Sequence, residues 1–345
     1  MSAPCLPTMV AAPSPSRRPS CMRARRAGRA PAFHRPEELM LTRRHLIAAG
    51  SAALAAPAIL PSGARAETKS VKIATILAGT TIASFLLPER LKAMGFDAET
   101  LVFPSITQRM QAVASGDAQI GYGGVSAAIS LGGRGTALSI LSNACDGGWA
   151  LTARPEIAAL ADLAGRKVAA QAGTIQHLSL QWKLIKEGLA AKTEVVFMNP
   201  QDMPAALRGG DIDAMMAPEP YAAFPVVNGW GKPLWSGYDT PMGRCNLALM
   251  AAPAFVEANP ATTKAVLDAH REITAQLQKD PSSAADAIVK TLNLPRPVAL
   301  ASLQNTFFTT ETGPDFRRQV EALGQMMLEA RMTAKLPDWN RLLPR

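Results

Sequence analysis

The sequence contains few of the residues from which metal and redox sites are built. It has four cysteines and four histidines, and neither a CxxC nor an HExxH motif. Half of each belong to an N-terminal leader, and the rest of the chain holds Cys145, Cys245, His177 and His270. Two isolated histidines are too few for a typical zinc site, so the sequence predicts no metal site and no cofactor.

Motifs of enzyme nucleophiles are also missing. No Gly-x-Ser-x-Gly elbow occurs, and the candidates for acid–base chemistry are Glu219, Asp146 and His177. This scarcity favours a binding protein over a secreted enzyme, which is kept as the alternative from a different class.

An overall excess of positive charge is present, but it is confined to one end. The net charge is +9 over 345 residues. Residues 1–66 hold ten arginines and two glutamates, which leaves 26 basic and 25 acidic residues in the remainder. The main body of the chain therefore has no electrostatic reason to bind nucleic acid. Its length and its 48% hydrophobic content predict a globular protein made of two lobes or of one large α/β unit.

The leader has the pattern of an export signal. Arg43 and Arg44 precede an uncharged stretch, residues 46–60, which ends near Ala64-Arg65-Ala66. This pattern predicts a twin-arginine signal, cleaved after Ala66, and a periplasmic mature protein; the alternative is a buried, alanine-rich helix. Because Met40 alone begins a complete signal, we expect translation to start there, and residues 1–39 to be an over-extended reading of the gene. No later apolar run approaches the length of a membrane span.

From Val71 onward, short apolar runs alternate with helical patterns, which is typical of βαβ units around mainly parallel sheets. The first series predicts strands at residues 71–77, 98–103, 118–122 and 137–141, and helices at 81–94, 106–114 and 126–131. A strand at 149–153 follows with no helix before it, and this break predicts the exit from the first lobe. The second series predicts strands at 167–171, 194–198 and 212–217, helices at 174–187 and 203–207, and a returning strand at 246–251.

After Pro253 the pattern is wholly helical, at residues 260–278, 282–291, 297–305 and 314–331, and these helices are expected to pack on the first lobe. An internal echo links the two series: residues 112–117 and 206–211 both end a short helix on a glycine before a strand. The echo suggests that the two lobes are related.

Several segments resemble one family. They are Ala114-Ser-Gly-Asp-Ala-Gln-Ile120, Leu160-Ala-Asp-Leu-Ala-Gly-Arg-Lys-Val168, Gly173-Thr-Ile-Gln-His177, and Ala206-Leu-Arg-Gly-Gly-Asp-Ile-Asp-Ala214 followed by Pro218-Glu-Pro-Tyr221. Their order and spacing are similar to those of the substrate-binding proteins of ABC importers of the nitrate, sulfonate and taurine type, which include binders of thiamine-pyrimidine precursors. The match covers about residues 70–260.

The resemblance implies a type II periplasmic binding protein fold, with a ligand cleft between two hinged βα lobes. Lobe I is expected at residues 68–152 and 242–345, and lobe II at residues 153–241. The implied function is that of a receptor, expected to be a monomer, which closes around a small polar organic molecule and delivers it to a membrane permease and its ATPase. The expected ligand is sulfonate- or taurine-like, zwitterionic or pyrimidine-like. A TRAP-type or sensory binding protein is the nearer alternative. The cysteine-rich segment of the pyrimidine-synthesising yeast relatives is absent, which argues against that activity.

Ligands of open α/β sheets lie beyond the carboxyl ends of strands, where helix N-termini favour anions and polar acceptors. Four loops fit this rule, and a fifth position, at the lobe crossing, adds an amide. The candidate ligand-binding residues are Thr80, Thr81, Gly124, Ser126, Asn143, Thr174, Gln176, His177, Glu219 and Tyr221.

Each candidate has a structural alternative. Thr80 and Glu219 can cap helices, Gly124 can belong to a tight turn, and His177 can be a surface residue. If the resemblance holds and Glu219 faces the cleft, the ligand needs a donor or a cationic group, because an unpaired carboxylate repels a bare anion. This reasoning favours a zwitterionic or heterocyclic ligand over nitrate.

The family fold would also place the strands at residues 149–153 and 246–251 side by side. Cys145 and Cys245 immediately precede these strands, and an oxidising compartment permits a disulfide. On this basis we expect a Cys145–Cys245 disulfide at the hinge, the alternative being two buried free thiols.

Overall fold

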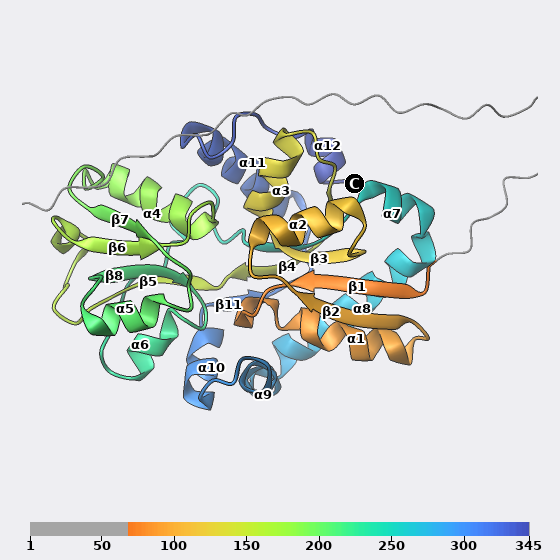
Figure 1. Ribbon diagram of the computed structural model, residues 1–345, viewed down its shortest axis with the longest axis horizontal. Coiled ribbons are helices and arrows are strands. Elements are labelled where there is room, and N and C mark those ends of the chain that lie inside the picture. Colours follow the sequence, from red (N-terminus) through yellow and green to blue (C-terminus); the bar gives the residue numbers. More distant parts are fainter. Residues whose placement is uncertain (1–67, 345) are drawn as a thin grey trace, which may run out of the picture. The chain divides into compact units, whose positions relative to one another are not determined.

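The computed structural model describes residues 68–344, which form two sheets flanked by helices (Figure 1). The leader, with Arg43, Arg44 and the expected cleavage after Ala66, lies outside the described residues. Within residues 68–344, no helix is long and apolar enough to cross a membrane.

The first sheet has six strands in the order β11-β4-β10-β3-β1-β2. Its strands are β1 (Ser70–Thr75), β2 (Asp97–Val102), β3 (Ile120–Gly124), β4 (Ser139–Gly147), β10 (Leu247–Ala251) and β11 (Thr306–Phe308). Strands β2, β1 and β3 are parallel, and β10 runs antiparallel to both β3 and β4. The helices that follow its strands are α1 (Ala83–Ala93), α2 (Ile106–Ser115) and α3 (Val125–Gly133), with the short helix η1 (Gly79–Thr81) before α1.

The second sheet has five strands in the order β7-β6-β8-β5-β9. Its strands are β5 (Trp149–Ala153), β6 (Lys167–Ala170), β7 (Glu194–Phe197), β8 (Ala214–Pro218) and β9 (Lys232–Trp235). Its helices are η2 (Leu160–Leu163), α4 (Ile175–Lys186), α5 (Met203–Gly209) and α6 (Ala223–Val227). Strands β7, β6 and β8 are parallel, and β5 runs antiparallel to β8.

The two sheets repeat one plan, in which a group of three parallel strands has an antiparallel strand beside it: β10 beside β3 in the first sheet and β5 beside β8 in the second. The echo found in the sequence marks equivalent points of this plan. Helix α2 ends at Gly116 and helix α5 at Gly210, both in the left-handed conformation with φ of 86° and 84°. Glycine adopts this conformation without steric strain, so each helix can stop and turn directly into its strand.

The chain leaves the first sheet earlier than the sequence predicted. The strand Trp149–Ala153 was expected in lobe I, up to residue 152, but as β5 it pairs with β8 and β9 of the second sheet. The first crossing is therefore at Gly147 and Gly148. Strand β10 pairs with β3 and β4, so β5 and β10 are not side by side as the resemblance implied.

Both residues of the crossing have to be glycine. Gly147 and Gly148 have φ of 63° and 81°. A Cβ atom at Gly148 would come within 2.2 Å of the Thr80 side chain, and one at Gly147 within 2.8 Å of the carbonyl of Asn305. Backbone conformation and crowding together exclude any larger residue here.

Glu219 directly follows β8 and lies beside this crossing. Its backbone N–H donates to the carbonyl of Gly148 at 2.8 Å. The carboxylate accepts hydrogen bonds from Asn305 Nδ2 at 3.1 Å and from the backbone N–H of Ala223, at the start of α6, at 3.0 Å. Burial raises the pKa of Glu219 to about 7, against the lowering effect of those two hydrogen bonds. The side chain thus ties lobe II to the C-terminal segment that carries Asn305.

The C-terminal helices cover the first sheet, as predicted, but one strand interrupts them. They are α7 (Pro253–Ala258), α8 (Pro260–Lys279), α9 (Pro281–Leu292), α10 (Arg296–Leu303), α11 (Pro314–Glu329) and α12 (Trp339–Leu342). Between α10 and α11, β11 adds to the edge of β4, so the prediction of a wholly helical tail was wrong. Helix α10 also contacts α6 of the second lobe.

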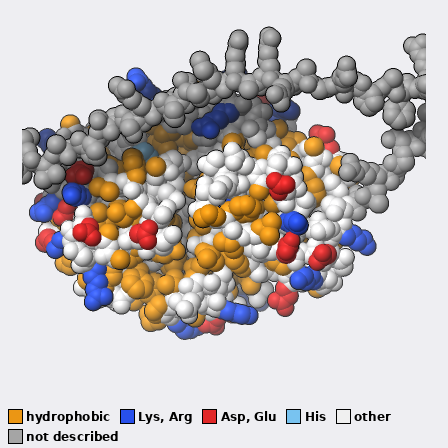
Figure 2. All heavy atoms as spheres, viewed as in Figure 1, with side chains coloured by type: hydrophobic (Ala, Val, Ile, Leu, Met, Phe, Trp, Pro, Cys, Tyr) orange, Lys and Arg blue, Asp and Glu red, His pale blue; other side chains and the backbone are white. Residues whose placement is uncertain are grey.

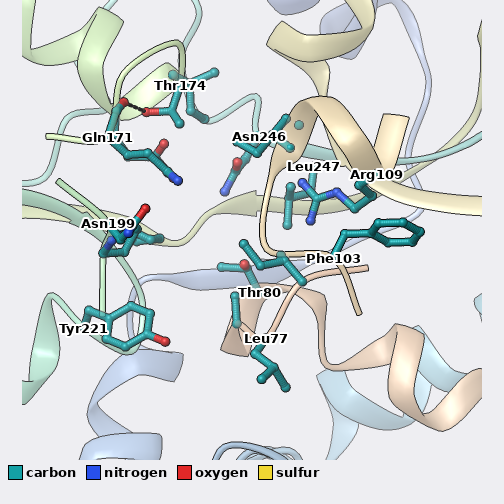
Figure 3. Close-up of a pocket in the computed structure, with 18 of the residues that line it drawn as sticks. Leu77, Thr80, Phe103, Arg109, Gln171, Thr174, Asn199, Tyr221, Asn246 and Leu247 are labelled. Carbon is teal, nitrogen blue, oxygen red and sulfur yellow. Dashed lines mark hydrogen bonds between the residues drawn. The ribbon is translucent and has the colours of Figure 1, made fainter. Parts of the chain in front are cut away.

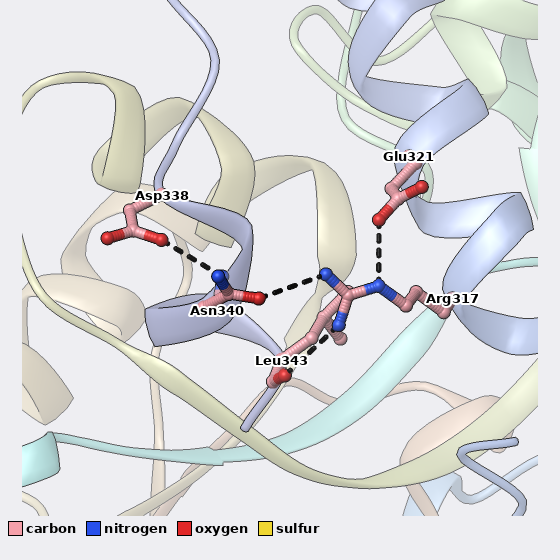
Figure 4. Close-up of polar contacts among 5 residues, drawn as sticks. All are labelled: Arg317, Glu321, Asp338, Asn340 and Leu343. Carbon is pink, nitrogen blue, oxygen red and sulfur yellow. Dashed lines mark hydrogen bonds and ion pairs between the residues drawn. The ribbon is translucent and has the colours of Figure 1, made fainter. Parts of the chain in front are cut away.

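The end of the tail is fixed by a single arginine of α11 (Figure 4). Arg317 Nε donates to Glu321 Oε1 at 2.8 Å, while its other nitrogens reach the side chain of Asn340 and the carbonyl of Leu343 at 3.4 and 3.5 Å. Asp338 caps α12 by accepting from the backbone N–H of Asn340 at 3.0 Å. These contacts hold the last helix against the first lobe.

Cys145 and Cys245 are free and buried, so the disulfide expected from the sequence is not formed. Cys145 packs with Leu247 and Leu249, whereas Cys245 packs with Ala248 and Met250. Successive side chains of β10 point to opposite faces of the sheet, so the two thiols lie in cores on opposite faces. They behave as small apolar residues.

We therefore expect both cysteines to remain reduced. Burial raises the pKa of both thiols, which disfavours the reactive thiolate. Alkylation of the unfolded protein without reductant, followed by peptide mass mapping, should label both Cys145 and Cys245. Recovery of their two peptides as one linked species would contradict the structure.

The buried Glu219 predicts a pH dependence of stability. Its pKa in the folded state, about 7, lies above its ordinary value of 4.5, so the folded protein binds the extra proton between these limits. The contribution of Glu219 to stability is then complete below pH 4.5 and is lost as the pH rises through 7. Glu219→Gln should be more stable than the wild type at pH 8 by about 2 kcal/mol, and similar to it at pH 5.

Melting curves from pH 5 to pH 8 test this. The matched control is Glu89→Gln, at an exposed position of α1. If the difference in stability between wild type and Glu219→Gln is the same at every pH in this range, the carboxyl does not take up a proton in the folded state.

Candidate functional site

A cavity of about 490 Å³ lies between the two lobes (Figure 3). Lobe I contributes the loops that follow β1, β2 and β3, and lobe II those that follow β6, β7 and β8. The start of β10 closes it through Asn246 and Leu247. All six parallel strands therefore point their carboxyl ends at this one cavity. The sequence predicted this place for the loops after β1, β3, β6 and β8, and the structure adds those after β2 and β7.

Six of the ten candidate residues line this cavity. They are Thr80, Gly124, Ser126, Thr174, Gln176 and Tyr221. Thr174 is also the N-cap of α4: its Oγ1 accepts from the N–H of His177 at 3.3 Å and donates to the carbonyl of Gln171 at 2.7 Å. Gly124 is the N-cap of α3 and makes no side-chain cap, and Ser126, in the first turn of that helix, lines the cavity beside it.

The other four candidates are placed elsewhere. Thr81 is buried and its hydroxyl donates to the carbonyl of Ile76 at 2.7 Å. Asn143 Nδ2 donates to Asp146 Oδ1 at 2.9 Å, inside lobe I. His177 packs edge-on against Phe197, and burial lowers its pKa. These side chains do not line the cavity.

Glu219 is the fourth of these residues, and its position corrects the expectation of a carboxylate in the cleft. It is 1% exposed and is held by Ala223 and Asn305, while its neighbours Pro218 and Tyr221 line the cavity. It caps α6, which was the structural alternative. A preference for a cationic ligand group therefore has no support from this residue.

The lobe II wall is polar and uncharged. Four amide side chains line it: Gln171, Gln176, Asn199 and Gln201. Within residues 68–344 none of these four amides has a side-chain hydrogen bond to another residue, and Thr174 and Tyr221 add hydroxyls beside them. An amide offers both a donor and an acceptor, so this wall can match a range of polar groups.

The lobe I wall is mainly apolar. Leu77 and Val102 are 44% and 48% exposed, which is unusual for large apolar side chains, and Phe103 and Ile106 lie beside them. Figure 2 shows apolar side chains gathered on the lobe I side of the groove between the two halves. A ligand with an apolar flank can cover these side chains and remove them from water.

One charged side chain lines the cavity, and the sequence-based reasoning missed it. Arg109 of α2 is 2% exposed, and its Nε and Nη1 atoms are buried without a hydrogen-bond partner. Burial lowers the pKa of Arg109 to about 10, and no carboxylate among residues 68–344 pairs with it. In Figure 3 its guanidinium lies beside Leu247 and Phe103, across the cavity from Tyr221.

The spacing of α2 contained the signal that identifies Arg109. Ser105 caps the helix, whose buried side chains are Arg109, Met110, Ala112 and Val113. Arg109 is therefore four residues before Val113 on the inward face, where a charge is rare unless it is paired or binds something. A basic residue on the apolar stripe of a short helix marks this position in the sequence alone.

The cavity is suited to binding an anion. An isolated buried charge is strongly unfavourable, so a guanidinium without a partner is stabilised when an anionic group enters beside it. Sulfonate and carboxylate oxygens match its fork of N–H donors. No acidic or second basic side chain lines the cavity, and residues 68–344 hold no cluster of potential metal ligands, so the arrangement provides binding groups without an acid–base pair.

Comparisons with known proteins agree with the fold. The crystal structure of the periplasmic aliphatic sulphonate binding protein SsuA from Escherichia coli superposes with a TM-score of 0.70 at 22% identity, covering 81% of this chain and 93% of that one. The alkanesulfonate-binding protein SsuA from Xanthomonas axonopodis pv. citri, bound to MOPS, gives 0.67 at 18% identity, covering 80% and 96%. The fold is thus that of periplasmic binding proteins.

Sequence similarity to curated proteins covers only part of the chain. A protein of Escherichia coli (strain K12), named as a candidate aliphatic sulfonates-binding protein, is 30% identical over 190 residues, 55% of this chain and 56% of that one. The chain thus spans about half the length of the curated relatives it matches. The model of the NMT1-like family matches residues 64–293, which is most of the part that the structure describes. The chain belongs to the NMT1-like family.

Proposed function

We propose that the protein is the periplasmic solute-binding component of an ABC importer and that it binds a small organic anion of the sulfonate class. The observation that carries the proposal is the buried guanidinium of Arg109, which lies unpaired in an interlobe cavity without a carboxylate. The names of the relatives, which describe sulfonate-binding proteins, support the same ligand class.

The two walls suggest how the ligand is held. Its anionic head pairs with Arg109, its apolar flank covers Leu77 and Val102 of lobe I, and its remaining polar groups meet the amides of lobe II. A ligand that contacts both lobes binds the closed form more tightly than the open one, and therefore shifts the equilibrium toward closure. The closed receptor then delivers its ligand to a membrane permease and its ATPase.

The ligand preference differs from the one inferred from sequence. A zwitterionic or heterocyclic ligand was favoured because Glu219 was expected in the cleft, and that carboxyl is engaged with Ala223 and Asn305 instead. The remaining charge is positive, so the proposed ligand needs an anionic head and no cationic group. Nitrate has such a charge but lacks an apolar flank, which leaves the lobe I wall uncovered.

The proposed function is tested by removing the charge of Arg109. Arg109→Gln should weaken binding of ethanesulfonate, followed by isothermal titration calorimetry, by about 2 kcal/mol or more, roughly 30-fold in Kd. Without ligand the variant should be at least as stable as the wild type, because the buried unpaired charge is gone. Arg134→Gln, at an exposed position after α3, is the matched control and should bind like the wild type.

A thermal-shift screen of sulfonates, carboxylates, nitrate and pyrimidines gives the ligand class, since a ligand bound only by the folded state raises the melting temperature. Stabilisation by neutral pyrimidines alone, or equal sulfonate affinity in Arg109→Gln, would contradict an anion receptor.

We propose further that the leader directs export through the twin-arginine route. Arg43 and Arg44 stand directly before the uncharged stretch of residues 46–60. Guanidinium groups bind through a planar fork that lysine lacks, so the pair is not replaceable by charge alone. Arg43→Lys with Arg44→Lys should therefore abolish the processed protein in the periplasmic fraction, whereas the wild type should appear there with Glu67 at its N-terminus. Unchanged processing of the double variant would indicate another route.

A further inference from the structure

A second cavity adjoins the first on the lobe II side. It encloses about 340 Å³ and shares two lining residues, Gln201 and Tyr221, with the interlobe cavity. Tyr221 is half-buried, and within residues 68–344 its hydroxyl makes no hydrogen bond to another residue. Its ring therefore stands between the two cavities as part of both walls.

The second cavity is walled mainly by apolar groups from two lobes. Phe224 and Trp230 of lobe II meet edge to face, with ring centroids 6.0 Å apart and planes at 64°. Pro204 of α5 and Leu294, from the α9–α10 loop of the C-terminal tail, also line this cavity. Exposed Arg208 stands at the edge, and no acidic residue lines the cavity.

We infer that this second cavity is a subsite for the apolar or aromatic tail of the ligand whose anionic head binds at Arg109. The inference rests on the proposed function and extends it to a ligand class: sulfonates with a tail long enough to pass Tyr221. It follows from the shared wall, because Arg109 and Tyr221 lie on opposite sides of the interlobe cavity (Figure 3). A head fixed at Arg109 directs the other end of an extended ligand toward Tyr221.

The chemistry of the walls fits a hydrocarbon or aryl group. A concave, mostly apolar pocket can bury most of the surface of an apolar ligand group. The two aromatic rings offer both edges and faces for contact with a ligand tail. Residues from both lobes contribute, since Leu294 belongs to the tail that packs on lobe I. A ligand tail seated here therefore adds contacts between the lobes.

Chain length is the variable that tests the subsite. In a series of 1-alkanesulfonates from ethanesulfonate to octanesulfonate, titrated calorimetrically into the purified protein, affinity should rise once the chain passes Tyr221. Each methylene that enters the second cavity should lower Kd by about fourfold, until the cavity is filled.

Two variants locate the effect. Trp230→Ala should weaken binding of octanesulfonate by about tenfold or more while changing that of ethanesulfonate little. Ala205→Gln, at an exposed position of α5 that lines the same cavity, should act in the same direction without disturbing the core. Trp182→Ala, on α4 and outside both cavities, is the matched control and should leave both affinities unchanged.

The outcomes separate this inference from the proposed function. Equal affinity across the series, or a length dependence that both Trp230→Ala and Ala205→Gln leave intact, overturns the subsite while the anion receptor stands. Loss of both ligands to the same extent in Arg109→Gln, with selective loss of the long one in the two lobe II variants, supports it. A wild type that binds no member of the series overturns the subsite and the sulfonate proposal together.

Discussion

The crossing at Gly147 and Gly148 is the constraint on which the two-lobed structure depends. The N–H of Gly148 donates to the carbonyl of Asn305 at 2.6 Å, and its carbonyl accepts from Glu219. The hydroxyl of Tyr238 bonds to the carbonyls of Trp149 and Asn305 at 3.1 Å each. One short stretch of backbone thus joins lobe I, lobe II and the C-terminal segment, and crowding leaves no room there for a Cβ atom.

This crossing explains why Glu219 does not line the cavity. Glu219 follows β8, as expected, but its carboxyl turns toward Asn305 and the start of α6 rather than into the cavity. Burial makes its ionised form unfavourable at neutral pH. The hinge therefore engages this carboxyl, and the cavity lining keeps a net positive charge from Arg109.

The electrostatics of the cavity then follow from a single uncompensated group. Arg109 belongs to α2, and the other buried residues of this helix are part of the lobe I core. The helix therefore holds Arg109 in place although its charge has no partner. The unliganded protein bears the desolvation penalty of that charge, and an entering anion removes it. Neutral amides on lobe II complete the wall without competing for the anion. The proposed anion binding rests on this one buried charge and on the polar, uncharged surface that lobe II adds to the cavity.

The sequence alone determined the alternation of strands and helices, because hydrophobic periodicity and glycine stops are local signals. It also indicated four of the six loops at the carboxyl ends of the parallel strands, since that edge follows from the order of elements; the loops after β2 and β7 were missed. Tertiary structure decided what local signals do not encode: that Trp149–Ala153 joins the second sheet, that Cys145 and Cys245 point to opposite faces, and that Glu219 turns into the hinge. Each depends on which strand a chain segment pairs with and which way a side chain faces, and those are properties of residues far apart in the sequence. Arg109 combines both cases. The spacing of apolar residues in α2 indicates that it lies on the buried face, but its lack of a hydrogen-bond partner is visible only in the folded molecule.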